Sequence, residues 1–336
     1  MFLSKKLIAI VLLAYFCPSG AAPLFDDSTA LEVTVAGPLS SLLEEDDDQK
    51  ELRFVLQANE LSHSIKVRLR GNSRRRVCDF PPLRLNFTDD DTAQSVFEGQ
   101  DKLKLVTHCR NSNSSELNML EEYAAYRIFN LISDVSYKVR LLRITYTDTD
   151  GRLRENNFDR YGFLIETASA LAGRVGGEPV QVPAVSLPSL DSQQAASVYI
   201  FQYLIGNTDW SLVTADTDDT CCHNGDLFDI ASDLFYVPYD FDLSGLVNAS
   251  YARPDPSLRI SRVTKRRYRG YCIATDALRS ALSTIKARRA EILDVISELP
   301  VLSQKDIERK TKYLDQFFEQ TENEDKIVKS FDRRCL

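Results

Sequence analysis

The chain contains little histidine, tryptophan and methionine: three His, one Trp and two Met occur among 336 residues. So few histidines, and cysteines that nowhere form a Cys-x-x-Cys pair, argue against a structural zinc site. Gly and Pro, at 13 and 12 residues, are too few for a fibrous or disordered chain. Beyond the N-terminus no apolar run approaches the roughly 18 residues that span a bilayer, so we expect no stable membrane anchor.

Positive charge is also in deficit. The sequence has 41 Lys+Arg against 49 Asp+Glu, a formal net charge of −8. General nucleic-acid binding needs a basic face, so we expect no nucleic-acid partner. The length and the 43% hydrophobic content are enough for a globular protein with a sizeable core.

The N-terminus has the pattern of a secretory signal. Lys5 and Lys6 precede an apolar run over residues 7–16, and small residues follow it. A short positive segment, about ten apolar residues and a small-residue end are typical of export signals. We therefore predict a signal peptide over residues 1–21, cleaved after Ala21, and a secreted or periplasmic mature protein.

Removal of this segment leaves six of the seven cysteines. An even number of cysteines in an exported protein indicates disulfide bonds. We predict Cys78–Cys109, because both lie in the N-terminal half, and a bond from one of Cys221 and Cys222 to Cys272. Cys335, which lies next to the C-terminus, would then tie the tail down.

Hydrophobic periodicity divides the mature chain into a strand-rich part, residues 22–166, and a helix-rich part, residues 167–336. In the first part apolar residues alternate with polar ones, as in half-buried strands, and one segment has the stripe of a helix. The predicted strands are 31–35, 52–56, 65–69, 83–87, 103–106, 139–146 and 161–165, and the predicted helix is 117–132. This pattern predicts a mostly antiparallel sheet with one inserted helix.

The second part begins with a loop over residues 173–188 that contains several Gly and Pro. A strand at 234–237 lies between helices at 194–205 and 276–299. Ser303 has the sequence context of an N-cap, with Asp306 at the capping-box position, so we expect a last helix to begin there.

Polar residues with a chemical role concentrate between residues 206 and 245. Asp209 follows an apolar helix, Asn224 follows His223, and Asp240 and Asp242 follow an apolar strand. Asn and Asp oxygens are ligands for Mg²⁺ that holds nucleotide phosphates. A further Asp without a metal can accept a proton from a substrate hydroxyl. A base, then an Asn, then a metal-binding Asp after a strand is the order found in protein kinases.

Several short motifs resemble the CotH-type spore-coat protein kinases and, more distantly, the HipA-type kinases. No single motif is specific, but six of them occur in order over most of residues 30–250. They are VRLRGNS (67–73), LRLNF (83–87), EYAAYRIF (122–129), YGFLIE (161–166), HN (223–224) and VPYDFD (237–242).

The resemblance implies an α+β, two-lobed protein-kinase-like fold, with a β-rich N-lobe holding one inserted helix and a helix-rich C-lobe. ATP would lie between the lobes with Mg²⁺ or Mn²⁺, and the partner would be an exported protein substrate. The implied roles are these: Asp209 is catalytic; Asn224, Asp240 and Asp242 bind metal; Glu122 pairs with the phosphate-binding cation; Glu166 and its neighbours receive adenine; and Gly71, Asn72 and Ser73 cover the phosphates.

The sequence departs from the family in two places. Pro81-Pro82 stand where the family has lysines, which leaves Arg84 or Lys104 as the phosphate-binding cation. Asp209 and Asn224 are 15 residues apart, against about five in typical kinases. Two alternatives to a kinase therefore remain open: a non-catalytic surface or coat protein of the same fold, and an enzyme that transfers AMP.

Two kinds of charged segment, a basic run and two acidic clusters, can be interpreted either as solvated surface or as binding sites. A basic run contains Arg262, Lys265, Arg266, Arg267 and Arg269; it is either a solvated loop or a surface for phosphate or an acidic peptide. The acidic clusters 89–91 and 216–219 lack the spacing of a calcium loop and are expected to be solvated turns.

Overall fold

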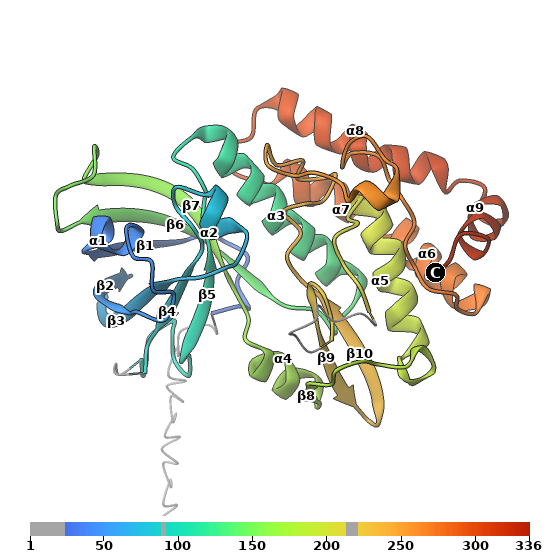
Figure 1. The fold of residues 1–336 in the computed structure, drawn as a ribbon, viewed down its shortest axis with the longest axis horizontal. Coiled ribbons are helices and arrows are strands. Elements are labelled where there is room, and N and C mark those ends of the chain that lie inside the picture. Colours follow the sequence, from blue (N-terminus) through green and yellow to red (C-terminus); the bar gives the residue numbers. More distant parts are fainter. Residues whose placement is uncertain (1–23, 89–91, 213–220) are drawn as a thin grey trace, which may run out of the picture.

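The computed structural model describes residues 24–88, 92–212 and 221–336. The predicted signal peptide and the acidic clusters 89–91 and 216–219 lie outside these residues. The described chain has mixed α/β structure, with strands dominating the first part and helices the second (Figure 1).

Seven strands of the first part form a closed barrel in the order β1-β2-β3-β4-β5-β7-β6. Neighbouring strands are antiparallel except β1 and β6, whose parallel pairing closes the barrel. The strands are β1 (Leu31–Gly37), β2 (Leu52–Ala58), β3 (Leu61–Leu69), β4 (Leu83–Asn86), β5 (Lys102–Val106), β6 (Val139–Asp148) and β7 (Asn157–Ile165). The alternation in the sequence therefore predicted all seven strands but not the closure.

The alternating residues fill the barrel. In β3, Ile65, Val67 and Leu69 are buried, while the residues between them are less buried, as the period of two predicts. Two short helices lie on the barrel, α1 (Leu39–Leu43) and α2 (Arg74–Val77).

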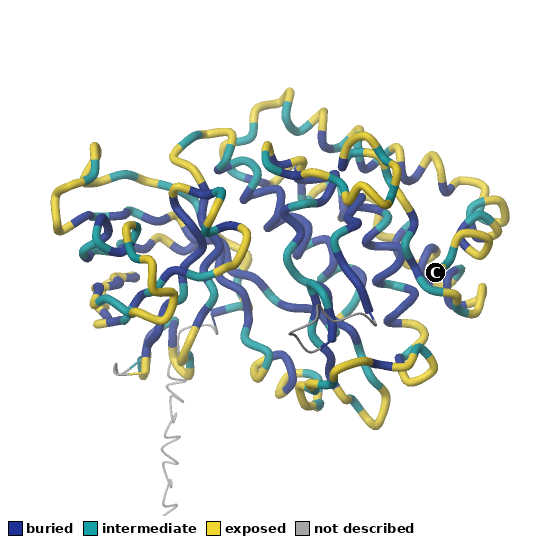
Figure 2. The backbone as a smooth tube through the Cα atoms, in the orientation of Figure 1, coloured by how far each residue is buried: buried dark blue, intermediate teal, exposed yellow. Residues whose placement is uncertain are grey.

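Helix α3 (Asn113–Ile132) joins the two parts of the molecule. It starts at Ser112, whose side chain accepts a hydrogen bond from the N–H of Ser115. Its buried side chains belong to the larger hydrophobic core, which also includes strand residues of the barrel such as Val106 and Phe163. Figure 2 shows this helix as the buried middle of the molecule.

The second part packs helices around a small sheet of three antiparallel strands in the order β10-β9-β8. Its elements are α4 (Ala168–Val175), β8 (Glu178–Val180), α5 (Ser192–Ile205), β9 (Gly225–Ile230), β10 (Asp233–Pro238), α6 (Thr275–Ala287), α7 (Arg289–Ser297), α8 (Gln304–Gln320) and α9 (Glu324–Asp332). Two short 3-10 turns, η1 (Leu187–Ser189) and η2 (Pro256–Leu258), complete it.

Three expectations for this part need correction. The predicted helix 276–299 is two helices, separated at Arg288, because α6 packs on α5 whereas α7 packs on α3. The predicted loop 173–188 contains the end of α4, strand β8 and η1. Helix α8 begins at the Ser303 cap as predicted, but α9 follows it.

Within the described ranges, no helix is both long enough and apolar enough to cross a membrane.

Candidate functional site

The cavity that holds the candidate catalytic residues lies where the barrel meets the second part. It has a volume of about 610 Å³ and contains side chains from segments far apart in the sequence. Asp209, Asn224, Asp240 and Asp242 all line it, and so does the turn Gly71–Asn72–Ser73. A second, inner cavity shares this turn and Asp240, and extends to Lys104, Val106, Glu122 and Ile165.

Asp209 is held by the end of helix α5. The helix stops at Gly206, whose φ of 67° is in the left-handed region that favours glycine. A Cβ at Gly206 would lie 2.1 Å from Tyr313 Oη, so the position also has no room for a side chain. The next residue, Asn207, is buried and accepts a hydrogen bond from the N–H of Asp209 at 3.0 Å.

Each oxygen of the Asp209 carboxylate has a hydrogen-bond partner among the other residues that line the cavity. His223 Nε2 lies 3.0 Å from Oδ1, and Asn224 Nδ2 donates to Oδ2 at 2.9 Å. Asn224 also donates to the Asp209 carbonyl at 2.7 Å. The 15-residue separation in the sequence is thus closed in space. The Asp209 side chain remains 37% exposed, so it is oriented but accessible from the cavity.

Arg74, at the start of α2, is the centre of the buried part of the site, and sequence reasoning missed it. Its guanidinium is 2.8 Å from Glu122 Oε1, 2.6 Å from Asp240 Oδ1 and 2.9 Å from Asp242 Oδ2. Burial alone would lower the pKa of Arg74, but Asp242, Glu122 and Asp240 raise it well above its ordinary value. Three arginines directly after the Gly71–Ser73 turn were the available signal.

The expected partner of Glu122 therefore has to be corrected. Arg84 and Lys104 were the candidates, but Glu122 pairs with Arg74. Glu122 is buried on α3, and this burial raises the pKa of its carboxyl group to about 7 despite the opposing effect of Arg74.

Asp240 and Asp242 occupy different surroundings. The Asp240 side chain is 42% exposed, and its backbone N–H donates to Tyr126 Oη at 3.0 Å. Asp242 is buried and accepts a hydrogen bond from Tyr251 Oη at 2.8 Å as well as from Arg74. Burial raises the pKa of Asp242, while Arg74 opposes the rise. Asp240 is therefore the more accessible of the two carboxylates.

The two candidate cations lie beside each other but face different surroundings. Arg84 on β4 is the register partner of Lys104 on β5. Lys104 lines the inner cavity, with Nζ 5.1 Å from the centre of the Tyr239 ring, whereas Arg84 is not among the residues that line either cavity. Burial and the nearby Arg70 lower the pKa of Lys104.

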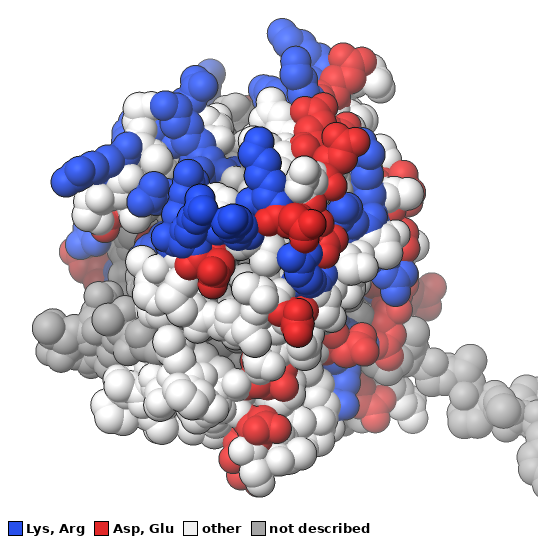
Figure 3. Space-filling model, turned by 90° about the vertical axis from the view of Figure 1, so that its right-hand side faces the viewer, with Lys and Arg blue, Asp and Glu red and all other residues white. Residues whose placement is uncertain are grey.

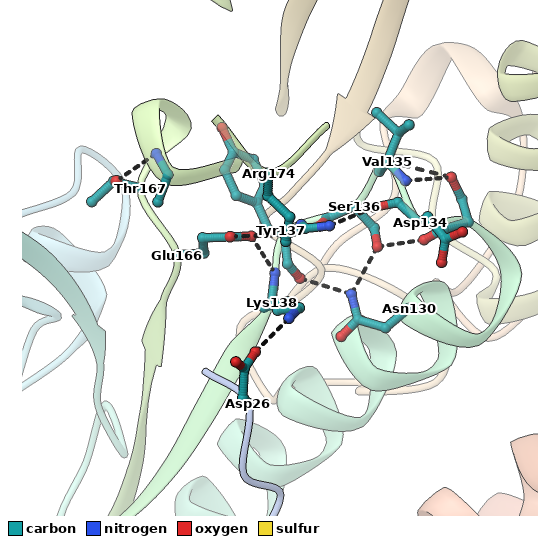
Figure 4. A network of polar contacts seen from close by, with 12 residues as sticks. Asp26, Asn130, Asp134, Val135, Ser136, Tyr137, Lys138, Glu166, Thr167 and Arg174 are labelled. Atoms are coloured by element: carbon teal, nitrogen blue, oxygen red, sulfur yellow. Dashed lines mark hydrogen bonds and ion pairs between the residues drawn. The ribbon is translucent and has the colours of Figure 1, made fainter. Parts of the chain in front are cut away.

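Glu166 is occupied by contacts within the protein (Figure 4). Its carboxylate accepts two hydrogen bonds from Arg174, at 3.1 and 2.9 Å, and one from the N–H of Lys138 at 3.0 Å. Its own N–H donates to the Lys138 carbonyl. The residue that lines the inner cavity here is Ile165. The side chain and the N–H of Glu166 are thus already engaged within the protein, and neither is free to contact adenine as expected.

The donor set suits a hard cation without forming a complete metal site. Asn224, Asp240 and Asp242 share the larger cavity. In the described parts of the chain no group of three or more His, Cys, Asp or Glu could hold a metal ion by itself. Mg²⁺ in nucleotide sites is commonly held by one or two carboxylates together with phosphate oxygens and water. The residues present fit that arrangement.

The cysteines pair differently from the expectation in two of three cases. Cys78–Cys109 is present as predicted. Cys221 pairs with its neighbour Cys222 at the cavity wall, and Cys272 pairs with Cys335. The sequence could not show which cysteines pair, because the pairing depends on which segments of the chain come together in the fold. Three cysteine pairs at disulfide distance are compatible with an extracytoplasmic protein.

Few known proteins are similar to this chain. No protein-family model and no curated protein matches the chain. Among solved structures the chain is similar to the crystal structure of a Helicobacter pylori proinflammatory kinase, CtkA. The identity is 12%, the match covers 71% of this chain and 90% of that chain, and the TM-score is 0.39. A similarity this loose does not establish a common fold, so the function is argued from the site.

Proposed function

We propose that this chain is an exported, CotH-type atypical protein kinase that transfers the γ-phosphate of ATP to hydroxyl groups of another exported protein. One observation carries the proposal: four polar side chains, from the end of α5, the start of β9 and the end of β10, line a single cavity together with the Gly71–Ser73 turn. In this reading residues 22–166 are an N-lobe, residues 167–336 are a C-lobe, and ATP binds between them.

Asp209 would orient the substrate hydroxyl and accept its proton. His223 and Asn224 each hold one of its oxygens, which fixes the rotation of the carboxylate. A positioned carboxylate near a hydroxyl lowers the barrier mainly through orientation and proton transfer. His223 is therefore a positioning residue in this proposal.

Asn224, Asp240 and Asp242 would hold the metal ion, Mg²⁺ or Mn²⁺. When bound, the metal would neutralise charge on the transferring phosphoryl group. Asp240 is the more exposed carboxylate and therefore the more accessible ligand. Asp242 is buried and shares Arg74 with Asp240 as an ion-pair partner. Asn224 donates to Asp209 through Nδ2, which leaves its Oδ1 as the atom for a metal.

The phosphate-binding cation would be Arg74 or Lys104. Arg74 makes the ion pair with Glu122 that the family's cation makes, and it directly follows the turn that would cover the phosphates. Lys104 lies deeper, in the inner cavity beside Tyr239. An arginine fork can contact two phosphate oxygens at once, which suits this position.

A second candidate, a non-catalytic surface or coat protein of the same fold, is favoured by two contacts of one side chain. Arg74 bonds to Asp240 and Asp242 together, so its guanidinium already neutralises the two carboxylates that a metal needs. In an active kinase Arg74 must yield at least one of these contacts when metal and ATP bind.

The test is phosphoryl transfer by the purified, oxidised protein. The protein is incubated with γ-labelled ATP and Mn²⁺, with and without an acidic carrier protein. We expect label on the protein or the carrier, reduced at least about 100-fold in Asp209→Ala and Asp240→Ala. The exposed Asp233 at the start of β10 provides the control, because Asp233→Ala should leave transfer unchanged.

Two other outcomes would replace the proposal. Label transferred from α-labelled ATP, with the mass of one AMP added to the product, would indicate an AMP transferase. No label from either nucleotide, in a protein that the melting curve shows to be folded, would favour the non-catalytic protein.

A further inference from the structure

One segment of the second part carries a concentration of positive charge that the proposed chemistry does not use. Residues 253–269, here called the basic loop, lie between β10 and α6. They contain seven Lys or Arg and one acid, Asp255, so their net charge is 7 − 1 = +6 in a chain of −8. The rest of the chain therefore carries −8 − 6 = −14.

The basic loop is fixed to the body of the protein by its inward-facing residues. Val263 is buried in a small cluster with Val247, Ala249 and Ala252. Tyr268 is buried and stacks on Phe331, with ring centres 4.2 Å apart. These anchors hold the loop in one arrangement although it has no long helix or strand.

Two of its arginines also point inward. Arg266 donates to the carbonyls of Leu204 and Tyr313 and stacks on the Tyr313 ring at 4.0 Å. Arg269 donates to the carbonyl of Thr208.

The other five cations are exposed: Arg253, Arg259, Arg262, Lys265 and Arg267. Within residues 24–88, 92–212 and 221–336 none of the five forms an ion pair with a carboxylate. Exposed arginines elsewhere do, for example Arg152 with Glu44 and Arg288 with Glu291. Five exposed cations in one segment, none of them in an ion pair with a described carboxylate, repel one another and favour an anionic partner. Figure 3 shows one face of the molecule, on which Lys and Arg side chains lie together on one part and Asp and Glu side chains lie beside them.

The basic loop adjoins the candidate site at two points. Arg269 contacts the carbonyl of Thr208, the residue before Asp209. The Val263 carbonyl oxygen is 2.7 Å from the point where a Cβ on Gly245 would stand, and Gly245 is three residues beyond Asp242. These two contacts join the basic loop to the segments that carry Asp209 and Asp242.

We propose that the basic loop is the docking surface for the protein substrate, and that the substrate carries clustered Asp or Glu side chains next to the hydroxyl that is modified. The inference names the substrate class of the proposed kinase and rests on that function. A nucleic acid fits less well for two reasons. The remaining charge of −14 repels a long polyanion, and the loop's Tyr268 is buried and offers no ring for base stacking.

Binding is tested without ATP, by fluorescence anisotropy of a labelled peptide. The probe is a peptide of alternating Glu, Asp and Ser, compared with the same peptide in which Gln and Asn replace the acids. We expect the acidic peptide to bind at least about tenfold more tightly, and its affinity to fall as salt is raised.

The test variant removes four exposed cations together: Arg259→Ser, Arg262→Ser, Lys265→Ser and Arg267→Ser. The matched control removes four exposed cations of the barrel: Arg53→Ser, Lys102→Ser, Arg143→Ser and Arg154→Ser. We expect the loop variant to lose about tenfold or more in affinity for the acidic peptide. The control should stay within about twofold of the unmodified protein, because its four cations lie outside the basic loop and exposed charges contribute little to stability.

Three results would overturn the inference: equal binding of the neutral peptide, equal loss in both variants, or tighter binding of a single-stranded oligonucleotide of the same charge. The transfer assay separates this failure from failure of the proposed function. Transfer to peptides without a preference for acids would leave the kinase and remove the docking surface. Binding of acidic peptide at the loop without any transfer would leave the docking surface and remove the kinase.

Discussion

Arg74 is the residue on which the buried part of the site depends. It is buried, and it is the shared partner of Glu122, Asp240 and Asp242. A buried ion cluster of this kind is sensitive to the loss of one member, because the buried carboxyl groups of Glu122 and Asp242 have little water to solvate them. The same contacts place Arg74 where a nucleotide phosphate would need a cation.

Arg74→Ala should therefore lower the free energy of unfolding by about 3–5 kcal/mol, because it leaves the buried carboxyl groups of Glu122 and Asp242 without the partner that they share. Urea unfolding at neutral pH measures the change. Arg76→Ala is the control: Arg76 is exposed on the same short helix, so its loss should cost less than about 0.5 kcal/mol. Equal costs for the two variants would show that the ion cluster does not stabilise the fold.

His108 gives the protein a pH dependence that the site does not cause. It is fully buried against Phe80 and Tyr146, and neither ring nitrogen has a hydrogen-bond partner within the described residues. Burial, with a contribution from Arg160, lowers the pKa of His108 to about 3. The unfolded chain then binds a proton near pH 6.5 that the folded chain refuses, so stability falls as the pH falls below about 6.5.

From this shift we expect His108 to lower the unfolding free energy by about 2 kcal/mol between pH 7.5 and pH 5. The raised pKa of Glu122 acts in the opposite direction over the same range, so the unmodified protein is compared with His108→Phe, which keeps the contribution of Glu122 and lacks that of His108. Urea midpoints at the two pH values measure the difference. At pH 7.5 the histidine is neutral in both states, so that measurement reports packing alone. An unchanged pH dependence in the variant would mean that His108 is protonated in the folded protein.

At the scale of elements, the end of helix α5 connects the fold with the candidate catalytic residue. Gly206 ends the helix with φ of 67°, and Tyr313 from α8 lies directly over it. Gly206→Ala should cost about 1–3 kcal/mol for the left-handed backbone, and more for the clash with Tyr313. Tyr313→Phe in the same chain removes the nearest atom and should recover part of the cost, as thermal unfolding would show. No recovery would mean that the backbone conformation alone sets the cost.

Local patterns predicted most of the elements but not their partners. The alternation in residues 65–69 and the Ser303 cap each gave an element that the structure contains. The break at Arg288 left no sequence signal, because Ile285 and Ile292 keep helical spacing across it. The two helices separate because they pack on different neighbours, which is a tertiary effect.

The candidate site followed the same division. Asp209, Asp240 and Asp242 were candidates because each follows a predicted element, and Asn224 was a candidate because it lies between them in the order found in kinases. The structure brings the four side chains to one cavity. Arg74 was missed because its role depends on α2 meeting α3 and the end of β10, contacts between residues 48 and more positions apart.

At the scale of the whole molecule, the disulfides differ in how much chain they constrain. Cys272–Cys335 spans 63 residues and ties the C-terminal helices to the segment that follows the basic loop, whereas Cys221–Cys222 joins neighbours. Loop-closure entropy predicts that Cys272→Ser with Cys335→Ser lowers the unfolding free energy by about 4 kcal/mol. Replacing Cys221 and Cys222 by Ser should change it far less. Guanidinium unfolding of the two double variants compares them, and equal losses would contradict this explanation.

The most direct measurement for the whole molecule is calorimetric titration with ATP in the presence of Mg²⁺ or Mn²⁺. Binding that requires the metal, is abolished by a chelator, and is lost in Asp240→Ala but kept in Asp233→Ala is the result that the proposed nucleotide cleft predicts. The absence of binding with either metal, in protein whose melting curve shows it to be folded, would contradict it.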